Sequence, residues 1–279
     1  GDEIMGQTGS IAPTISVFNI ARDGILTQNF ADTTTLPLGL SPSQLLISSK
    51  SKLAFLDTFT PPPLNNVTGA NQILPFAIGA DGALVPVASG GIGAPVTPPL
   101  LLGLVQNPNA NIIYGSLVGA AKIGVFTYDN AGNVKLADIV DVGLKGGGPC
   151  WSVISADGKY LYSADTGSNS VGVYSLANPL YPKQIQEFVL GGPQNSANSP
   201  TAKRETTDFE LALDPGGKSL YVIDHQNDAA GDFPQGNALH VLSVASDGKV
   251  SESANSTQFL PSNIPAGDAP QGVAVIAAS

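Results

Sequence analysis

The sequence predicts an all-β fold, a β-propeller of four-stranded antiparallel blades, and three observations lead to this prediction. Turn signals recur along the chain at a regular spacing, and short apolar segments of strand length lie between them. No helical period persists for more than about two turns. The composition agrees, because 32 glycines and 22 prolines with only 12% charged residues favour many turns over long helices.

The stretch 148–176 shows the repeating unit most clearly. An apolar run ends at Asp157-Gly158, which we interpret as a two-residue hairpin turn because both positions tolerate positive φ. The chain returns through 160–162, a segment rich in tyrosine, and turns again at 166–169 into a third strand. A fourth strand over about 184–190 completes the unit, and four strands in about forty-five residues is the size of one propeller blade.

The same pattern divides a single domain, residues 1–279, into about five blades. The predicted boundaries are 34–90, 97–142, 147–192 and 205–262, with a fifth blade composed of 1–33 and 268–279. Turn signals at Asp23, Asp81, Asn130 and Asp247 share one position in the unit, between the third and fourth strands. The chain ends in a first-strand pattern and begins without one. We therefore expect the N- and C-terminal strands to pair and close the ring.

Charge and cysteine content limit the partners and the compartment. A net charge of −10 and a pI near 4.4 argue against binding a nucleic-acid backbone, which needs clustered basic residues. Cys150 is the only cysteine, so no intrachain disulfide forms, and we interpret it as a buried small side chain. No apolar run is long enough to span a membrane. The low charge and two glycosylation sequons, at Asn66 and Asn255, favour a secreted, extracellular glycoprotein.

Three segments resemble the blade repeat of a known family. They are PCWSVISADGKYLYSADTGSNSVGVYSL, DFELALDPGGKSLYVID and the closing APQGVAV. These are similar to the YVTN-type blades of the β-propeller lactonase family, which includes propellers like 6-phosphogluconolactonase and carboxymuconate cyclase. The resemblance implies a propeller fold over nearly the whole chain and a lactonase-like activity. Members of that family usually have seven blades, whereas this chain supplies about five.

A polar segment after the second strand of the last blade contains the candidate catalytic residues. His225 titrates near neutral pH and would act as a general base or polarise a lactone carbonyl, beside Asp224. Arg204, Glu205 and Asp208 lie on the preceding inter-blade connection and would face the same channel mouth. Together the five supply a base, a site for water and a cation for the developing oxyanion. The alternative is a solvated polar loop without a catalytic role. We expect His240, between Leu239 and Val241, to be structural.

A second hypothesis concerns metal binding. Asp57, Asp165 and Asp224 each come just after a predicted second strand, and Ser116 takes the corresponding place in the third unit. A ring of carboxylates at the mouth would hold Ca²⁺, a cation that prefers oxygen ligands. The alternative is that these aspartates cap the turns that follow them. No other cofactor is predicted.

Two functions of different classes remain open. The first is a secreted lactonase-like hydrolase that opens a sugar lactone or similar cyclic ester at the channel mouth. The second is a non-catalytic extracellular propeller that binds a carbohydrate or a partner, or assembles with itself. Propellers host both kinds of function. If the ring is open, an unpaired strand edge favours self-association by β-augmentation.

Overall fold

The structure is a computed structural model that describes residues 12–59, 71–142, 147–190, 206–226, 238–253, 256–259 and 272–276. These residues form four antiparallel sheets of four or five strands and one two-stranded sheet. In the described part of the chain, the only helical segment is the short 3₁₀ turn Val118–Ala120. The predicted all-β propeller with four-stranded antiparallel blades is confirmed.

Each blade uses consecutive strands, and the strand bounds are as follows. Blade 1 contains β3 (Pro42–Ile47), β4 (Leu53–Thr58), β5 (Gln72–Ile78), β6 (Leu84–Pro86) and β7 (Ile92–Gly93), the last two both pairing with β5. Blade 2 contains β8 (Leu102–Gln106), β9 (Ile112–Leu117), β10 (Lys122–Tyr128) and β11 (Val134–Asp141). Blade 3 contains β12 (Pro149–Ile154), β13 (Tyr160–Asp165), β14 (Ser170–Ser175) and β15 (Lys183–Val189). Blade 4 contains β16 (Thr206–Leu213), β17 (Ser219–Gln226), β18 (Ala238–Val244), β19 (Val250–Glu252) and β20 (Gln258–Phe259). A separate hairpin is made of β1 (Thr14–Ile20) and β2 (Leu26–Thr35).

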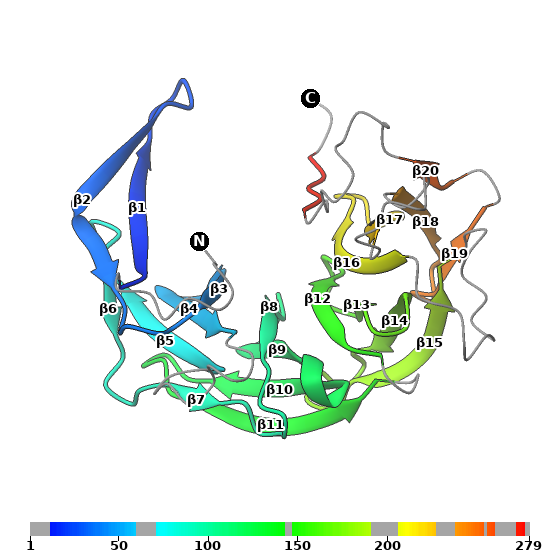
Figure 1. Cartoon of the computed structure of the whole chain (residues 1–279), viewed down its shortest axis with the longest axis horizontal. Helices are drawn as coiled ribbons and strands as arrows, with labels where there is room; N and C mark the ends of the chain where they lie inside the picture. The colour runs from blue at the N-terminus through cyan, green and yellow to red at the C-terminus, as the bar shows by residue number, and fades with distance from the viewer. Residues whose placement is uncertain are drawn as a thin grey trace.

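The blades are arranged as an open arc (Figure 1). The first strands β3, β8, β12 and β16 lie on the inner side of the arc and contact one another in sequence, whereas β11 and β15 lie on the outer side. Successive residues of a strand point to opposite faces, so the second strands of blades 2 and 3 each pack against both neighbouring blades. In β13, Leu161 faces blade 2 and Tyr162 faces blade 4. Because both faces of these second strands are buried between blades, most of the residues along them are apolar.

Two kinds of tight turn join the strands, at the two positions that the sequence predicts. Between first and second strands, the N–H groups of residues 48, 107, 155 and 214 donate to the carbonyl five residues on, each at 2.9 Å. Between third and fourth strands, the N–H groups of residues 79, 129 and 245 donate to the carbonyl four residues on. In the three third-to-fourth turns, a glycine with positive φ follows a tight turn, as in hairpins that end in a G1 bulge.

The turn at Asp157-Gly158 differs from the expected two-residue hairpin. The N–H of Ser155 donates to the carbonyl of Tyr160, so residues 156–159 form the loop. Within it Gly158 alone has a positive φ, 72°. A single residue in the left-handed conformation, Gly158, lets the turn match the twist of the two strands, so Asp157 does not need a positive φ.

The two ends of the chain do not form the expected closing blade in the described residues. The β1–β2 hairpin has the turn of a third-to-fourth pair, with the N–H of Ala21 donating to the carbonyl of Ile25, so it corresponds to the outer half of a blade. Its strands pair only with one another within the described ranges, and residues 272–276 are not in a strand. A Cβ at Gly272 would lie 3.5 Å from the carboxylate of Glu210 in β16, so this stretch lies beside blade 4. An alternating sequence predicts a strand, but it does not decide which edge that strand joins.

Candidate functional site

The three aspartates predicted as a ring lie inside the second strands rather than after them. Asp57 and Asp165 are completely buried in β4 and β13, and Asp224 is 2% exposed in β17. Asp57 faces blade 2, because its carboxylate bonds the backbone of β8. Asp165 shares the face of Leu161 and points toward blade 2, the blade before its own. Asp224 shares the face of Val222 and points toward blade 3, again the preceding blade.

The aspartates therefore occupy two different positions of the repeat. Aligned by the faces of their strands, Asp57 and Ser116 correspond to one another, and Asp165 and Asp224 occupy the next position along the strand. A one-residue offset turns a side chain to the opposite face of a sheet. The structure does not bring the three carboxylates together, and no group of three or more metal-binding side chains gathers among the residues it describes.

Asp57 joins two blades through backbone hydrogen bonds. Its Oδ1 accepts the N–H of Gln44 in its own blade, and its Oδ2 accepts the N–H of Gly103 in β8 at 2.7 Å. Gly103 occupies a bulge of β8 and has a φ of +74°. A Cβ there would lie 2.5 Å from the carbonyl oxygen of Cys150 in β12. Asp57 is thus a structural residue of the interface between first strands.

Asp224 is paired with the histidine that the sequence suggests is structural. His240 Nε2 lies 3.3 Å from Asp224 Oδ2, and His240 Nδ1 lies 2.7 Å from Glu252 Oε1. All three side chains are at least nine-tenths buried. Thr257 donates its hydroxyl to the same oxygen of Glu252 at 2.9 Å. Burial alone would lower the pKa of His240, but the two carboxylates raise it from 6.5 to about 9, so the imidazole is a cation at neutral pH.

The remaining predicted catalytic residues are less fully defined. Arg204 and Glu205 lie outside the described residues, as do the sequon asparagines Asn66 and Asn255. Asp208 and His225 are described in their backbone only. The pairing of β16 with β17 sets Asp208 opposite Asp224 and Thr207 opposite His225. The backbone of three predicted residues therefore lies at one end of the two inner strands of blade 4.

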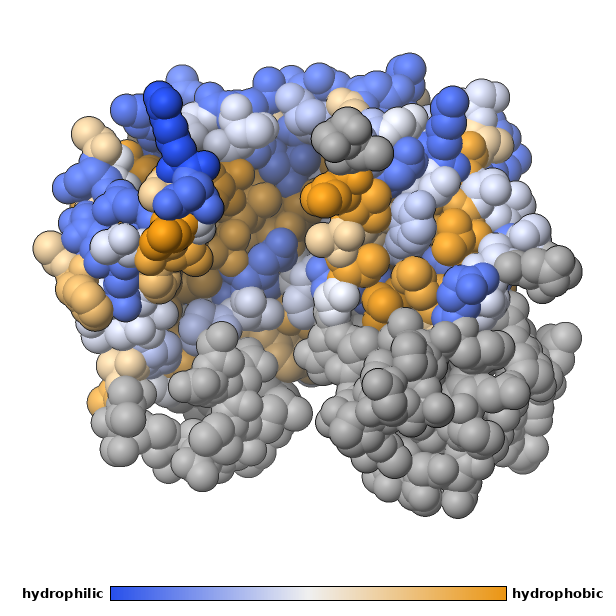
Figure 2. All heavy atoms as spheres, turned by 90° about the horizontal axis from the view of Figure 1, so that it is seen from above, coloured by the Kyte–Doolittle hydropathy of each residue, from blue (hydrophilic) through white to orange (hydrophobic). Residues whose placement is uncertain are grey.

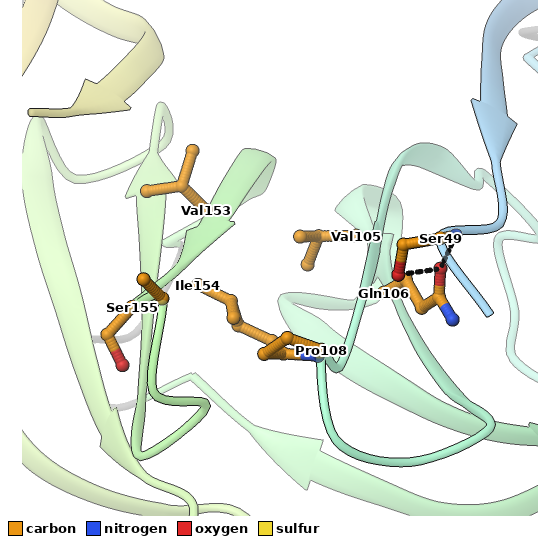
Figure 3. A pocket seen from close by; sticks show the side chains of 8 residues that line it. Ser49, Val105, Gln106, Pro108, Val153, Ile154 and Ser155 are labelled. Carbon is orange, nitrogen blue, oxygen red and sulfur yellow. Dashed lines mark hydrogen bonds between the residues drawn. The ribbon is translucent and has the colours of Figure 1, made fainter. Parts of the chain in front are cut away.

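A groove of about 330 Å³ lies between blades 2 and 3, near the turns that lead into the second strands and so at the other end of these strands from the buried aspartates (Figure 3). Val105, Pro108, Val153 and Ile154 supply its apolar walls, and polar groups come from Gln106 and two serines. The side-chain oxygen of Gln106 accepts the N–H of Ser49 at 2.9 Å, and its nitrogen donates to the hydroxyl of Tyr128. The groove would hold a small apolar group, but its lining contains no acid, base or cation.

Sequence reasoning missed two features of these polar residues. Glu252 was not singled out, although its position twelve residues after the buried-strand histidine His240 places it on the adjacent strand of the hairpin β18–β19. The buried face of Asp165 was also missed. A comparison of strand faces, Tyr162 with Tyr114 and Phe55, would have separated Asp165 from Asp57 by one position.

The fold and the arrangement of first strands define a β-propeller with four-stranded blades, in which ligand sites lie near the channel that the first strands line. Comparison with solved structures is more specific. The periplasmic gluconolactonase of Pseudomonas aeruginosa matches with a TM-score of 0.67 and 19% identity, over 88% of this chain and 65% of that one. A candidate 6-phosphogluconolactonase from Bacteroides uniformis matches with a TM-score of 0.65 and 18% identity, over 90% of this chain and 66% of that one. A protein from Lactobacillus plantarum matches with a TM-score of 0.66 and 16% identity, over 88% and 64%.

This chain therefore has the fold of the lactonase-like β-propellers and spans about two thirds of the length of these structures. No protein-family model and no curated protein matches the sequence. Among the residues described, no helix is both long and apolar enough to cross a membrane.

Proposed function

We propose that this protein is a lactonase-like propeller that hydrolyses a sugar lactone or a similar cyclic ester. The observation that carries the proposal is the match, over about nine-tenths of the chain, to propellers whose names give gluconolactones as their substrates. The predicted residues Asp208, Asp224 and His225 support it, because their backbone positions lie side by side where β16 begins and β17 ends. Asp224 is already bound to His240, so His225 and Arg204 are left as the proposed base and oxyanion partner.

The test measures opening of δ-gluconolactone and its 6-phosphate by acid release, against spontaneous hydrolysis in the same buffer. We expect turnover by the purified protein that falls by on the order of a hundredfold or more in Arg204→Ala and in His225→Ala. Arg22→Ala is the matched control, because Arg22 is the only other arginine and lies exposed in the β1–β2 turn. A folded wild-type protein that opens neither lactone faster than buffer rejects the proposal.

A second candidate function is supported by the apolar surface of the β1–β2 hairpin. Phe18, Ile20, Leu26 and Phe30 are 47–78% exposed on this outer half-blade. Seen from the open side of the arc, apolar residues also line the hollow between its two ends (Figure 2). Exposed apolar surface, together with a strand edge that pairs with no further strand within the described ranges, favours association with a partner or a second copy. Under this alternative the propeller is a binding or self-assembling module without catalysis.

Light scattering over a wide concentration range separates the two candidates. Self-assembly predicts dimers or larger species that dissociate in Phe30→Ser, whereas Leu136→Ser, an exposed apolar position on β11, leaves them intact. A monomer at every concentration removes the self-assembling version of the alternative.

We propose further that the protein is secreted and carries glycans at Asn66 and Asn255. The low fraction of charged residues and the two sequons support this. Expression in a secreting eukaryotic host should give protein in the medium whose mass falls on treatment with an N-glycosidase. An unchanged mass in the wild type removes the glycan assignment.

A further inference from the structure

Blade 3 contains a buried polar cluster between its second, third and fourth strands that neither candidate function uses. We call it the blade 3 cluster; its members are Ser163 and Asp165 of β13, Ser170 and Tyr174 of β14, and Glu187 of β15. Cross-strand pairing sets Ser163 and Glu187 on either side of Gly172, and Asp165 opposite Ser170. The cluster faces blade 2 and is enclosed by the apolar core between blades 2 and 3.

The cluster holds two acidic groups close together without a basic partner. The carboxyl groups of Asp165 and Glu187 lie within hydrogen-bonding reach of one another, and Asp165 is completely buried. No described lysine, arginine or histidine forms an ion pair with either. Two like charges at this depth require neutralisation, by a proton or by a cation.

The hydrogen bonds of the cluster leave specific atoms without partners. Ser163 donates to Asp165 Oδ1 at 2.7 Å, while Ser170 and Gln184 donate to the two oxygens of Glu187. Asp165 Oδ2 and the Tyr174 hydroxyl are buried without a hydrogen-bond partner in the described structure. A proton shared between the carboxyl groups would satisfy Oδ2 but leave the tyrosine hydroxyl unpaired. A hydrated cation would bind Asp165 Oδ2 directly and would place a water within hydrogen-bonding distance of the Tyr174 hydroxyl.

The backbone of Gly172 lies close beside the unpaired oxygen. A Cβ at position 172 would lie 2.7 Å from Ser163 Oγ and 2.8 Å from Asp165 Oδ2, so only glycine fits. Glu187 on the outer strand β15 and Ser168 in the β13–β14 turn are both partly exposed, and the hydroxyl of Ser168 lies 2.6 Å from that of Ser170. Every group that would contact an ion here is an oxygen, from carboxylates and hydroxyls.

We propose that the blade 3 cluster is a divalent cation site, with Asp165 and Glu187 as its charged ligands and Ca²⁺ as the ion it takes. Two carboxylates balance the charge of a divalent ion, and Ca²⁺ accepts hydroxyl and water oxygens in an irregular, flexible coordination. The site lies within one blade and includes only Asp165 of the three aspartates that were expected to form a ring.

The test uses the full chain after treatment with a chelator, and terbium as a luminescent probe for Ca²⁺. Excitation of Tyr174 should transfer energy to bound Tb³⁺, Ca²⁺ should displace it, and added Ca²⁺ should raise the thermal unfolding midpoint. Glu187→Gln changes a partly exposed residue and should weaken binding by on the order of tenfold or more. Asp165→Asn should abolish it.

Two control variants decide the location. Asp141→Asn removes an exposed carboxylate on β11 and should leave binding unchanged. Asp57→Asn should also bind normally, and a loss there with Glu187→Gln unaffected would place the ion at the channel mouth and overturn the proposal. Wild-type protein without Tb³⁺ luminescence or stabilisation by Ca²⁺ would show that a shared proton neutralises the pair instead.

Discussion

The buried His240 cation should make the stability of this protein fall at alkaline pH. The imidazole lies between the carboxylates of Asp224 and Glu252 and is only 1% exposed, so solvent screens these contacts little. In the unfolded chain its pKa returns to about 6.5, whereas in the folded protein it is about 9. The folded state therefore binds a proton more tightly than the unfolded state over this window.

The magnitude follows from the difference between the two values. A pKa raised from 6.5 to about 9 corresponds to about 3 kcal/mol of folding free energy. Because the folded pKa is raised, this contribution is present in full below pH 6.5 and is lost as the pH rises through 9. Neutral His240 has a single N–H, so one of the two buried carboxylates would lose its imidazole hydrogen bond and both would lose the positive charge between them, which is the physical origin of the loss.

The assay is urea unfolding at a series of pH values across this window, with His240→Gln as the reference. We expect the free energy of unfolding of the wild type to fall by about 3 kcal/mol from the acidic to the alkaline end of this pH window. The variant should be less stable than the wild type below pH 6.5, and its free energy of unfolding should change little across the window. An NMR titration of the two histidines gives the pKa directly, with His225→Ala to assign them. A His240 midpoint at or below 6.5, or a wild-type curve as flat as that of the variant, would refute the reasoning.

Three further substitutions test the packing between blades by urea unfolding. Gly103→Ala should destabilise the fold by about 2 kcal/mol or more, because its Cβ would meet the Cys150 carbonyl at 2.5 Å; Gly24→Ala, with a similar φ but open space, should cost only about 1 kcal/mol. Tyr162→Phe should leave stability unchanged or raise it, since the buried hydroxyl has no hydrogen-bond partner in the described structure; a clear loss would reveal one. Asp57→Asn should cost about 1–3 kcal/mol, because an amide nitrogen would face one of two backbone N–H groups; an unchanged midpoint would show that the bond to Gly103 contributes little.

The fold was predictable because each blade is specified locally. Strand alternation, the Asp-Gly and Pro-Gly-Gly turns, and the repeat of both along the chain are present in the sequence itself, and the structure places glycines with positive φ at those turns. The turn at Ala21–Ile25 even identifies β1 and β2 as an outer pair of strands. Local sequence patterns predict the strands and turns of a blade because adjacent strands of a blade are also adjacent in the chain.

The candidate site was less predictable, since it depends on which face each polar residue takes. Asp57 and Asp165 look equivalent in sequence, but a one-residue offset sends them to opposite faces of their blades. His240 was expected to be structural, yet its pairing with both Asp224 and Glu252 required three strands to come together. The closing pairing of the chain ends was expected from a strand-like pattern, and the described residues do not form it.

By itself, then, the sequence determined the all-β class, the length of the blades and the position of their turns, because these follow from contacts between neighbours in the chain. Only the tertiary structure decided that Asp57 joins two blades, that Asp224 holds a buried histidine, and that Asp165 faces Glu187 across Gly172. The physical reason is the strand period of two residues, which makes the face of a side chain depend on exact register and on what packs against it.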